Sequence, residues 1–211
     1  MSIAPELREH RVVLHDVSWN LYQSLRAANR NGGLRMTYDR GELEIMSPSR
    51  KHERTSYLIG RMIDEWTVLV GIAVEAGRNT TFSRQDVSRG LEPDNCYWIA
   101  HQALVRGKEE IDLAVDPPPD LALEVDVTRS SIPKLPIYQA LGVPEVWRWR
   151  LGMLEALQLD ANGQYVQQRG SAALPGFPLK LVEQFLEQAD REDDTALIRR
   201  FRKTIADLPR S

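Results

Sequence analysis

A short acidic strand constrains the fold of this chain more than any other feature of its sequence. Residues 120–126 read DLALEVD, so that small and aliphatic residues flank Glu124 on both sides. This pattern predicts a buried strand that takes Glu124 into the protein interior. Charged residues are seldom fully buried without a partner, because burial disfavours the charged form of a carboxylate. The sequence therefore favours a functional role for Glu124.

Two further signals accompany the strand. An acidic turn, Glu92-Pro93-Asp94, lies upstream, and Lys134 lies downstream at the predicted start of a helix. Mg²⁺ takes hard oxygen ligands, usually one or two carboxylates completed by water and phosphate oxygens, and it activates bound water. Asp94 and Glu124 are the expected ligands of Mg²⁺ or Mn²⁺, and Lys134 is the expected cation beside the attacking water. This set of residues predicts phosphodiester hydrolysis.

The charged residues around Glu124 also have plainer interpretations. Asp94 is typical of a simple turn, and Lys134 of a solvent-exposed surface. Asp126 lies two residues after Glu124 on the same strand face, and is either a third metal ligand or an acid at the strand end. Asp120 shares that face but follows three prolines, which favours a loop residue.

A helix predicted over residues 51–70 adds His52 and Glu53 in its first turn. In one interpretation one of these side chains faces the metal, with His52 as the expected supporting group. In the other, both are exposed, and the helix dipole favours Glu53. His52 and His101 do not have the spacing of a zinc or iron site.

The bulk properties are those of an ordinary globular protein. The 211 residues are enough for one well-buried domain. No apolar run approaches the roughly 20 residues that cross a bilayer, and the first residues lack the pattern of a signal peptide. The single Cys96 excludes an intramolecular disulfide framework. We therefore expect a cytoplasmic protein without membrane segments.

The formal net charge of −3 gives no global attraction to nucleic acid. Binding to a phosphate backbone must then depend on metal ions or on a local basic surface. Residues 50–54 and 199–203 are the candidate basic segments. Charge runs of this kind more often form solvated helix faces.

Hydrophobic spacing and turn residues predict a mixed α/β protein. Helices are expected over about 18–30, 51–70, 133–141 and 181–208, and strands over 34–38, 42–46, 72–75, 79–82, 96–100, 120–126, 145–149, 153–159 and 165–168. Ser18 is the predicted N-cap of the first helix, and Gly71 and Gly142 end the second and third. Asn31-Gly32-Gly33 breaks the chain, and residues 83–91 are expected to form a polar surface loop.

Six short motifs in a fixed order resemble the Uma2 family: 41–48 (GELEIMSP), His52, 92–94 (EPD), 119–125 (PDLALEV), 134–138 (KLPIY) and 142–147 (GVPEVW). These bacterial proteins are assigned to the PD-(D/E)XK nuclease superfamily. The resemblance spans about residues 18–160 and implies a restriction-endonuclease-like fold, in which helices flank a central mixed β-sheet. We expect a single domain over residues 1–211, with this nuclease-like core and a C-terminal helical extension at about 180–208.

By position, the resemblance assigns Asp94 to the acidic residue of the PD element and Glu124 to that of the (D/E)XK element. The family pattern expects a lysine two residues later, where this chain has Asp126. Lys134 on the following helix fits the role of a migrated lysine. Pro133 and Pro136 are compatible with this position, because a first helical turn tolerates proline.

These observations favour a metal-dependent endonuclease that uses Mg²⁺ or Mn²⁺, with DNA as the expected substrate. The alternative is a catalytically inactive module of the same fold that binds nucleic acid or a protein partner. A third interpretation is a hydrolase of a smaller phosphate ester. We also expect a homodimer, since nucleases that cut both strands often pair subunits.

Overall fold

The computed structural model describes residues 9–29, 33–78, 80–126 and 130–208. The chain break predicted at Asn31-Gly32 and the first residue of the strand predicted from Asn79 lie outside these ranges. The strands are β1 (His10–Leu14), β2 (Arg35–Asp39), β3 (Glu42–Ser47), β4 (Glu75–Ala76), β5 (Phe82–Arg84), β6 (Arg89–Leu91), β7 (Asn95–Trp98), β8 (Leu121–Asp126), β9 (Glu145–Arg150), β10 (Met153–Leu159) and β11 (Tyr165–Gln168). The helices are α1 (Trp19–Ala28), α2 (Arg50–Val70), α3 (Gln102–Val105), α4 (Leu135–Leu141), α5 (Leu179–Glu187) and α6 (Asp194–Ala206), with a short 3-10 helix at Ala189–Arg191.

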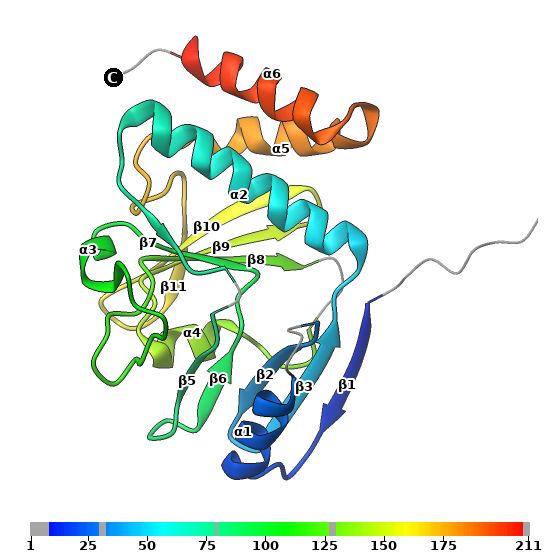
Figure 1. The fold of residues 1–211 in the computed structure, drawn as a ribbon, viewed down its shortest axis with the longest axis vertical. Helices are drawn as coiled ribbons and strands as arrows, with labels where there is room; N and C mark the ends of the chain where they lie inside the picture. The colour runs from blue at the N-terminus through cyan, green and yellow to red at the C-terminus, as the bar shows by residue number, and fades with distance from the viewer. Residues whose placement is uncertain (1–8, 30–32, 79, 127–129, 209–211) are drawn as a thin grey trace, which may run out of the picture.

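Among the described residues, the larger of two sheets contains six strands in the order β11-β10-β9-β8-β7-β4. β8 and β9 run parallel, and the other neighbouring pairs are antiparallel. The predicted mixed sheet with helices on its faces is therefore confirmed (Figure 1). The parallel pair places the carboxyl ends of β8 and β9 side by side.

The second sheet contains five strands in the order β1-β3-β2-β6-β5, and all its pairs are antiparallel. Helix α1 packs against it through Tyr22, whose ring stacks on that of Tyr38 with centroids 4.7 Å apart. Figure 1 shows this sheet with α1 on the opposite side of the larger sheet from α2, α5 and α6.

The alternating residues of β8 contact different layers of the protein. Leu121, Leu123 and Val125 share one hydrophobic core with α2, α5 and α6. Ala122 faces the other way, into a core formed with α4. Because side chains alternate along a strand, Glu124 lies on the α4 face. Among the described residues, no helix is long and apolar enough to cross a membrane.

Capping residues set the ends of the two helices nearest to β8. The hydroxyl of Ser49 accepts a hydrogen bond from the backbone N–H of His52, which places His52 in the first turn of α2. Gly71 ends α2 at a φ of 73°, a left-handed conformation that glycine adopts without steric cost. Lys134 is the N-cap of α4, and Pro136 stands in the first turn.

The expected surface loop over residues 83–91 is wrong, because most of it forms the β5–β6 hairpin. The polar residues of this segment favoured a loop, and its glycine has a structural reason. A Cβ atom at Gly90 would lie 2.4 Å from the Tyr22 hydroxyl, so the strand needs glycine where α1 approaches it. The strands expected over 72–75 and 79–82 are shorter and shifted toward the C-terminus, and Asp193 caps a new helix, α6, inside the segment expected to be one helix.

Candidate functional site

Pairing between β7 and β8 brings Asp94 next to Glu124. Asn95, the first residue of β7, pairs with Leu123. The backbone N–H of Asp94 donates to the carbonyl of Leu123 at 3.1 Å. In return, the N–H of Val125 donates to Asp94 Oδ2 at 2.7 Å. Asp94 is therefore held to the backbone of β8 on both sides of Glu124, through its own N–H on one side and its carboxylate on the other.

Helix α4 provides two groups that hold Glu124, which is only 3% exposed. Lys134 Nζ lies 2.5 Å from Glu124 Oε2. The hydroxyl of Tyr138 donates to Glu124 Oε1. Residues four apart lie on the same face of a helix, so Lys134 and Tyr138 reach the same carboxylate from one side. The interpretation of Lys134 as a solvent-exposed residue is therefore wrong.

Burial changes the protonation equilibria of these groups. Desolvation is the main cause that raises the pKa of Glu124 to about 7. The positive charge of Lys134 lowers this pKa only in part, and the negative charge of Asp94 raises it further. The pKa of Lys134 is also raised, since the attraction of Glu124 and Asp94 outweighs the cost of burying the ammonium. Lys134 is therefore a cation at neutral pH, and Glu124 gains or loses its proton near neutrality.

His52 lies between two carboxylates, and the expectation of an exposed first-turn residue is wrong. Its Nε2 atom lies 2.7 Å from Asp94 Oδ1, and its Nδ1 atom 2.7 Å from Glu9 Oε1. Burial alone would lower the pKa of His52, but Asp94 and Glu9 raise it to about 9. His52 in turn holds the pKa of Asp94 below its usual value despite burial. An imidazolium thus neutralises the Asp94 side of the site.

A chain of ion pairs connects His52 to the smaller sheet. Arg11 Nη2 contacts the second oxygen of Glu9 at 3.1 Å, and Arg11 Nη1 contacts Glu44 at 2.7 Å. Glu44 also accepts hydrogen bonds from the Ser130 hydroxyl at 2.8 Å and the Ser131 N–H at 2.7 Å. Glu44 on β3 therefore anchors the segment that leads into α4 and to Lys134.

Sequence reasoning missed Glu9, Glu44 and Tyr138 as parts of this site. Glu44 gives the same signal as Glu124, an acid between aliphatic neighbours on a predicted strand. Tyr138 stands four residues after Lys134 and shares its helix face. Glu9 has no comparable signal, because neither its spacing nor its neighbours relate it to His52.

The two remaining acids of the β8 segment differ in their surroundings. Asp126 is partly buried, and desolvation raises its pKa although the charges of Lys134 and Arg148 act to lower it. Asp120 lies at the other end of β8, where it accepts hydrogen bonds from the backbone N–H groups of Ile99 and His101. Asp120 therefore stabilises the turn after β7 and is not part of the site formed by Asp94 and Glu124.

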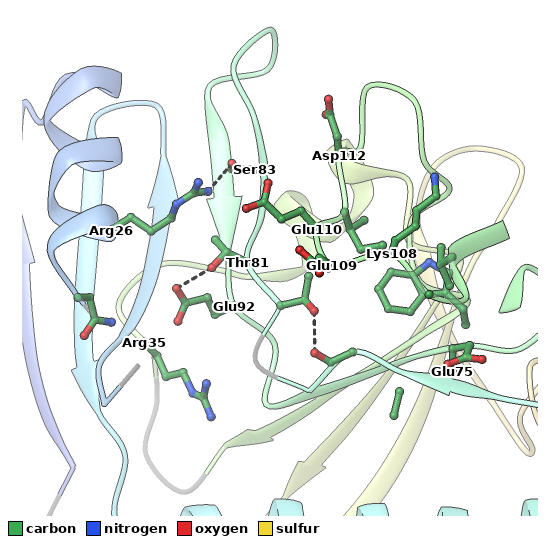
Figure 2. Close-up of a pocket in the computed structure, with 18 residues that line it drawn as sticks. Arg26, Arg35, Glu75, Thr81, Ser83, Glu92, Lys108, Glu109, Glu110 and Asp112 are labelled. Carbon is green, nitrogen blue, oxygen red and sulfur yellow. Dashed lines mark hydrogen bonds between the residues drawn. The ribbon is translucent and has the colours of Figure 1, made fainter. Parts of the chain in front are cut away.

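A cavity of about 180 Å³ adjoins Asp94 beside α2. Arg35, Arg61 and Arg78 contribute to its lining. Arg35 also lines a larger cavity of about 920 Å³, which Figure 2 shows between α1 and the segment after α3. Its ionisable lining residues are Arg26, Arg35, Lys108, Glu75, Glu92, Glu109, Glu110 and Asp112. The acids outnumber the bases, which disfavours a phosphate backbone in this larger cavity.

Asp94 and Glu124 have the donor chemistry of a magnesium or manganese site, since both offer carboxylate oxygens and Mg²⁺ uses one or two. In the part of the chain that the structure describes, no group of three His, Cys, Asp or Glu side chains is placed to hold an ion. The oxygens of Asp94 and Glu124 instead contact His52, Val125, Lys134 and Tyr138. Two carboxylates would leave the other positions around such an ion to water and phosphate oxygens.

The mixed sheet, the flanking helices and the position of two carboxylates and a lysine at one end of β8 define a restriction-endonuclease-like α/β protein. The model of the Uma2 family, described as "Putative restriction endonuclease", matches residues 19–189. The chain belongs to the Uma2 family. A search of the curated proteins finds no match.

Proposed function

We propose that this protein is a metal-dependent endonuclease that hydrolyses phosphodiester bonds, with DNA as its substrate. The observation that supports the proposal most is the convergence of Asp94, Glu124 and Lys134. These residues lie on separate elements, yet backbone pairing joins the first two and an ion pair of 2.5 Å joins the last two. Membership in the Uma2 family favours the same chemistry.

Asp94 and Glu124 would hold Mg²⁺ or Mn²⁺, which supplies a Lewis acid that lowers the pKa of bound water and stabilises charge on the phosphate. Lys134 then orients the attacking water and neutralises charge that develops on the phosphate, since its ammonium stays protonated at neutral pH. Tyr138 orients Glu124 through its hydroxyl. His52 fixes Asp94 from the side opposite to Val125. Asp126 is the third candidate ligand.

Cleavage assays test this proposal. Supercoiled plasmid and linear duplex DNA are incubated with the protein in EDTA, in Mg²⁺ and in Mn²⁺. We expect cleavage with either metal and none in EDTA. Glu124→Gln, which keeps the shape of the side chain, removes the activity, whereas Glu187→Gln on the exposed side of α5 leaves it unchanged. Absence of cleavage by the wild-type protein, or equal cleavage by Glu124→Gln, would contradict the proposal.

One observation favours the alternative of an inactive nucleic-acid-binding or protein-binding module. Lys134 forms an ion pair with Glu124, and His52 forms one with Asp94. Both carboxylates therefore have a cationic partner without a metal ion. Under this alternative the protein binds duplex DNA equally well in EDTA and in Mg²⁺, and it cuts neither form.

We further propose a homodimer and a cytoplasmic location. Two copies would allow both strands of a duplex to be cut. Cys96 is a buried free thiol, which suits a reducing compartment. Sedimentation of the purified protein at micromolar concentration tests the dimer, since a monomer mass throughout would exclude it.

A further inference from the structure

Two arginines on β9 lie beside the acids of β8. The parallel register pairs Glu124 with Arg148 and Asp126 with Arg150. Paired residues of neighbouring parallel strands point to the same face of a sheet, and the strands lie about 4.8 Å apart. The arginines therefore share the α4 face with Glu124 at the carboxyl ends of the two strands, where α/β proteins commonly bind ligands.

The two arginines differ in their own contacts. Arg148 donates from Nε and Nη2 to one oxygen of Glu155, at 2.9 and 2.8 Å, which fixes its guanidinium. Arg150 is exposed and forms no hydrogen bond or ion pair with any described residue. Arg150 thus presents five donors to the solvent next to the proposed reaction site, whereas the guanidinium of Arg148 beside it is already paired with Glu155.

Other arginines near α2 are already engaged. Arg54 pairs with Asp190 and Asp194, and Arg202 pairs with Glu65. These pairs join α2 to the C-terminal helices on the opposite face of the sheet. The basic segments expected from sequence at 50–54 and 199–203 are therefore partly occupied in holding helices together.

We propose that Arg150 binds a backbone phosphate of the nucleic-acid strand next to the bond that is cut. The proposal rests on the nuclease function proposed above and adds the path of the substrate, along the carboxyl ends of β8 and β9 on the α4 face. The contact is electrostatic and independent of base sequence, because a phosphate contact positions the strand and does not read it.

Binding measurements with a fluorescent 20-base-pair duplex test the contact. All variants are made in the Glu124→Gln protein, so that no DNA is cut, and affinity is measured from about 50 to 200 mM salt. We expect Arg150→Gln to weaken binding about fivefold or more and to reduce the slope of log affinity against log salt by about 1. Arg150→Lys keeps most of the slope, because it keeps the charge. Arg199→Gln, an exposed arginine on α6 without a described partner, is the matched control and leaves binding unchanged.

Equal affinity and equal slope for Arg150→Gln and the parent protein would overturn the proposal, as would the absence of duplex binding by the parent. The nuclease function is tested separately, by the cleavage assay on proteins that retain Glu124. If these proteins cleave DNA equally well with and without Arg150→Gln, the phosphate contact is contradicted and the nuclease function is not. If binding depends on Arg150 but no DNA is cleaved, the nuclease function is contradicted and the phosphate contact is not.

Discussion

Lys134 Nζ lies 2.5 Å from Glu124 Oε2, although the two residues are ten positions apart and belong to different elements. A lysine two residues after Glu124 would share its strand, but Asp126 occupies that position. Helix α4 supplies the cation instead, together with the Tyr138 hydroxyl. The site therefore depends on how α4 is held against β8.

Lys134→Met should remove the cation and leave the shape of the side chain nearly unchanged. We expect kcat for DNA cleavage to fall about 100-fold or more, since an electrostatic group at the reaction centre is lost. Mn²⁺ should bind at least as tightly as in the wild-type protein, because a neighbouring positive charge has been removed. Steady-state cleavage and calorimetric titration measure the two effects. Loss of metal binding together with activity would instead show that Lys134 holds the ligands in place.

Glu44→Gln should weaken both the fold and the site. The buried carboxylate of Glu44 contacts Arg11, Ser130 and Ser131, so its neutralisation removes one ion pair of Arg11 and the charged acceptor of the two serines. We expect the free energy of unfolding to fall by about 2–4 kcal/mol in urea denaturation. Glu42→Gln on the same strand is the control, because Glu42 is half-exposed and pairs with the exposed His15. A Glu44→Gln protein as stable as the control would contradict the anchoring role.

The His52 ion pairs predict a pH dependence of stability. The pKa of His52 is about 9 in the folded protein and about 6.5 when unfolded. The stabilising contribution is therefore complete below pH 6.5 and is lost as pH rises toward 9. It amounts to about 3 kcal/mol at most. The pKa of Glu124 is also raised, so its contribution to stability is likewise lost as pH rises. The effect of His52 must therefore be measured as the difference in stability between the wild-type protein and His52→Asn.

Urea denaturation of the wild-type protein and His52→Asn between pH 6 and 9.5 isolates the histidine. The difference in their free energies of unfolding should shrink across this range. A constant difference would mean that the pKa of His52 is the same in the folded and unfolded protein, which would contradict the ion pairs.

Tyr138→Phe removes a single hydroxyl from Glu124 Oε1. Loss of this donor leaves one oxygen of a buried carboxylate without its protein partner, which should cost about 1–3 kcal/mol of stability. Thermal unfolding measures the loss, and Tyr57→Phe on the exposed side of α2 serves as a comparison. If Tyr138 orients Glu124, saturating Mg²⁺ restores part of the lost stability, and a Mg²⁺-independent loss would contradict that role.

The sequence was sufficient for the fold class, because β8, α2 and the hairpin of β2 and β3 have strong and regular hydrophobic patterns. Local chemistry also indicated Glu124, since buried acids are rare enough to be noticed. The acidic turn before β7 and the lysine at the start of a predicted helix indicated Asp94 and Lys134. Each of these signals lies within a few residues of the group concerned.

The remaining parts of the site depend on distant partners. Glu9 meets His52 across 43 residues, and Glu44 meets Ser131 across 87, so no local pattern relates them. The β5–β6 hairpin was missed because its residues are polar, and its pairing depends on contacts such as the approach of Tyr22 to Gly90 that no local pattern shows. Strand β1 was not expected because its pairing with β3 becomes visible only in three dimensions.

Titration of the protein with Mn²⁺ by calorimetry tests most directly whether Asp94 and Glu124 form one metal site. We predict that the wild-type chain binds one ion, and that Asp94→Asn and Glu124→Gln each weaken binding about tenfold or more, a loss of about 1.4 kcal/mol. Glu187→Gln should bind as the wild type does. Unchanged affinity in both Asp94→Asn and Glu124→Gln, or no binding by the wild-type protein, would contradict the assignment of this site.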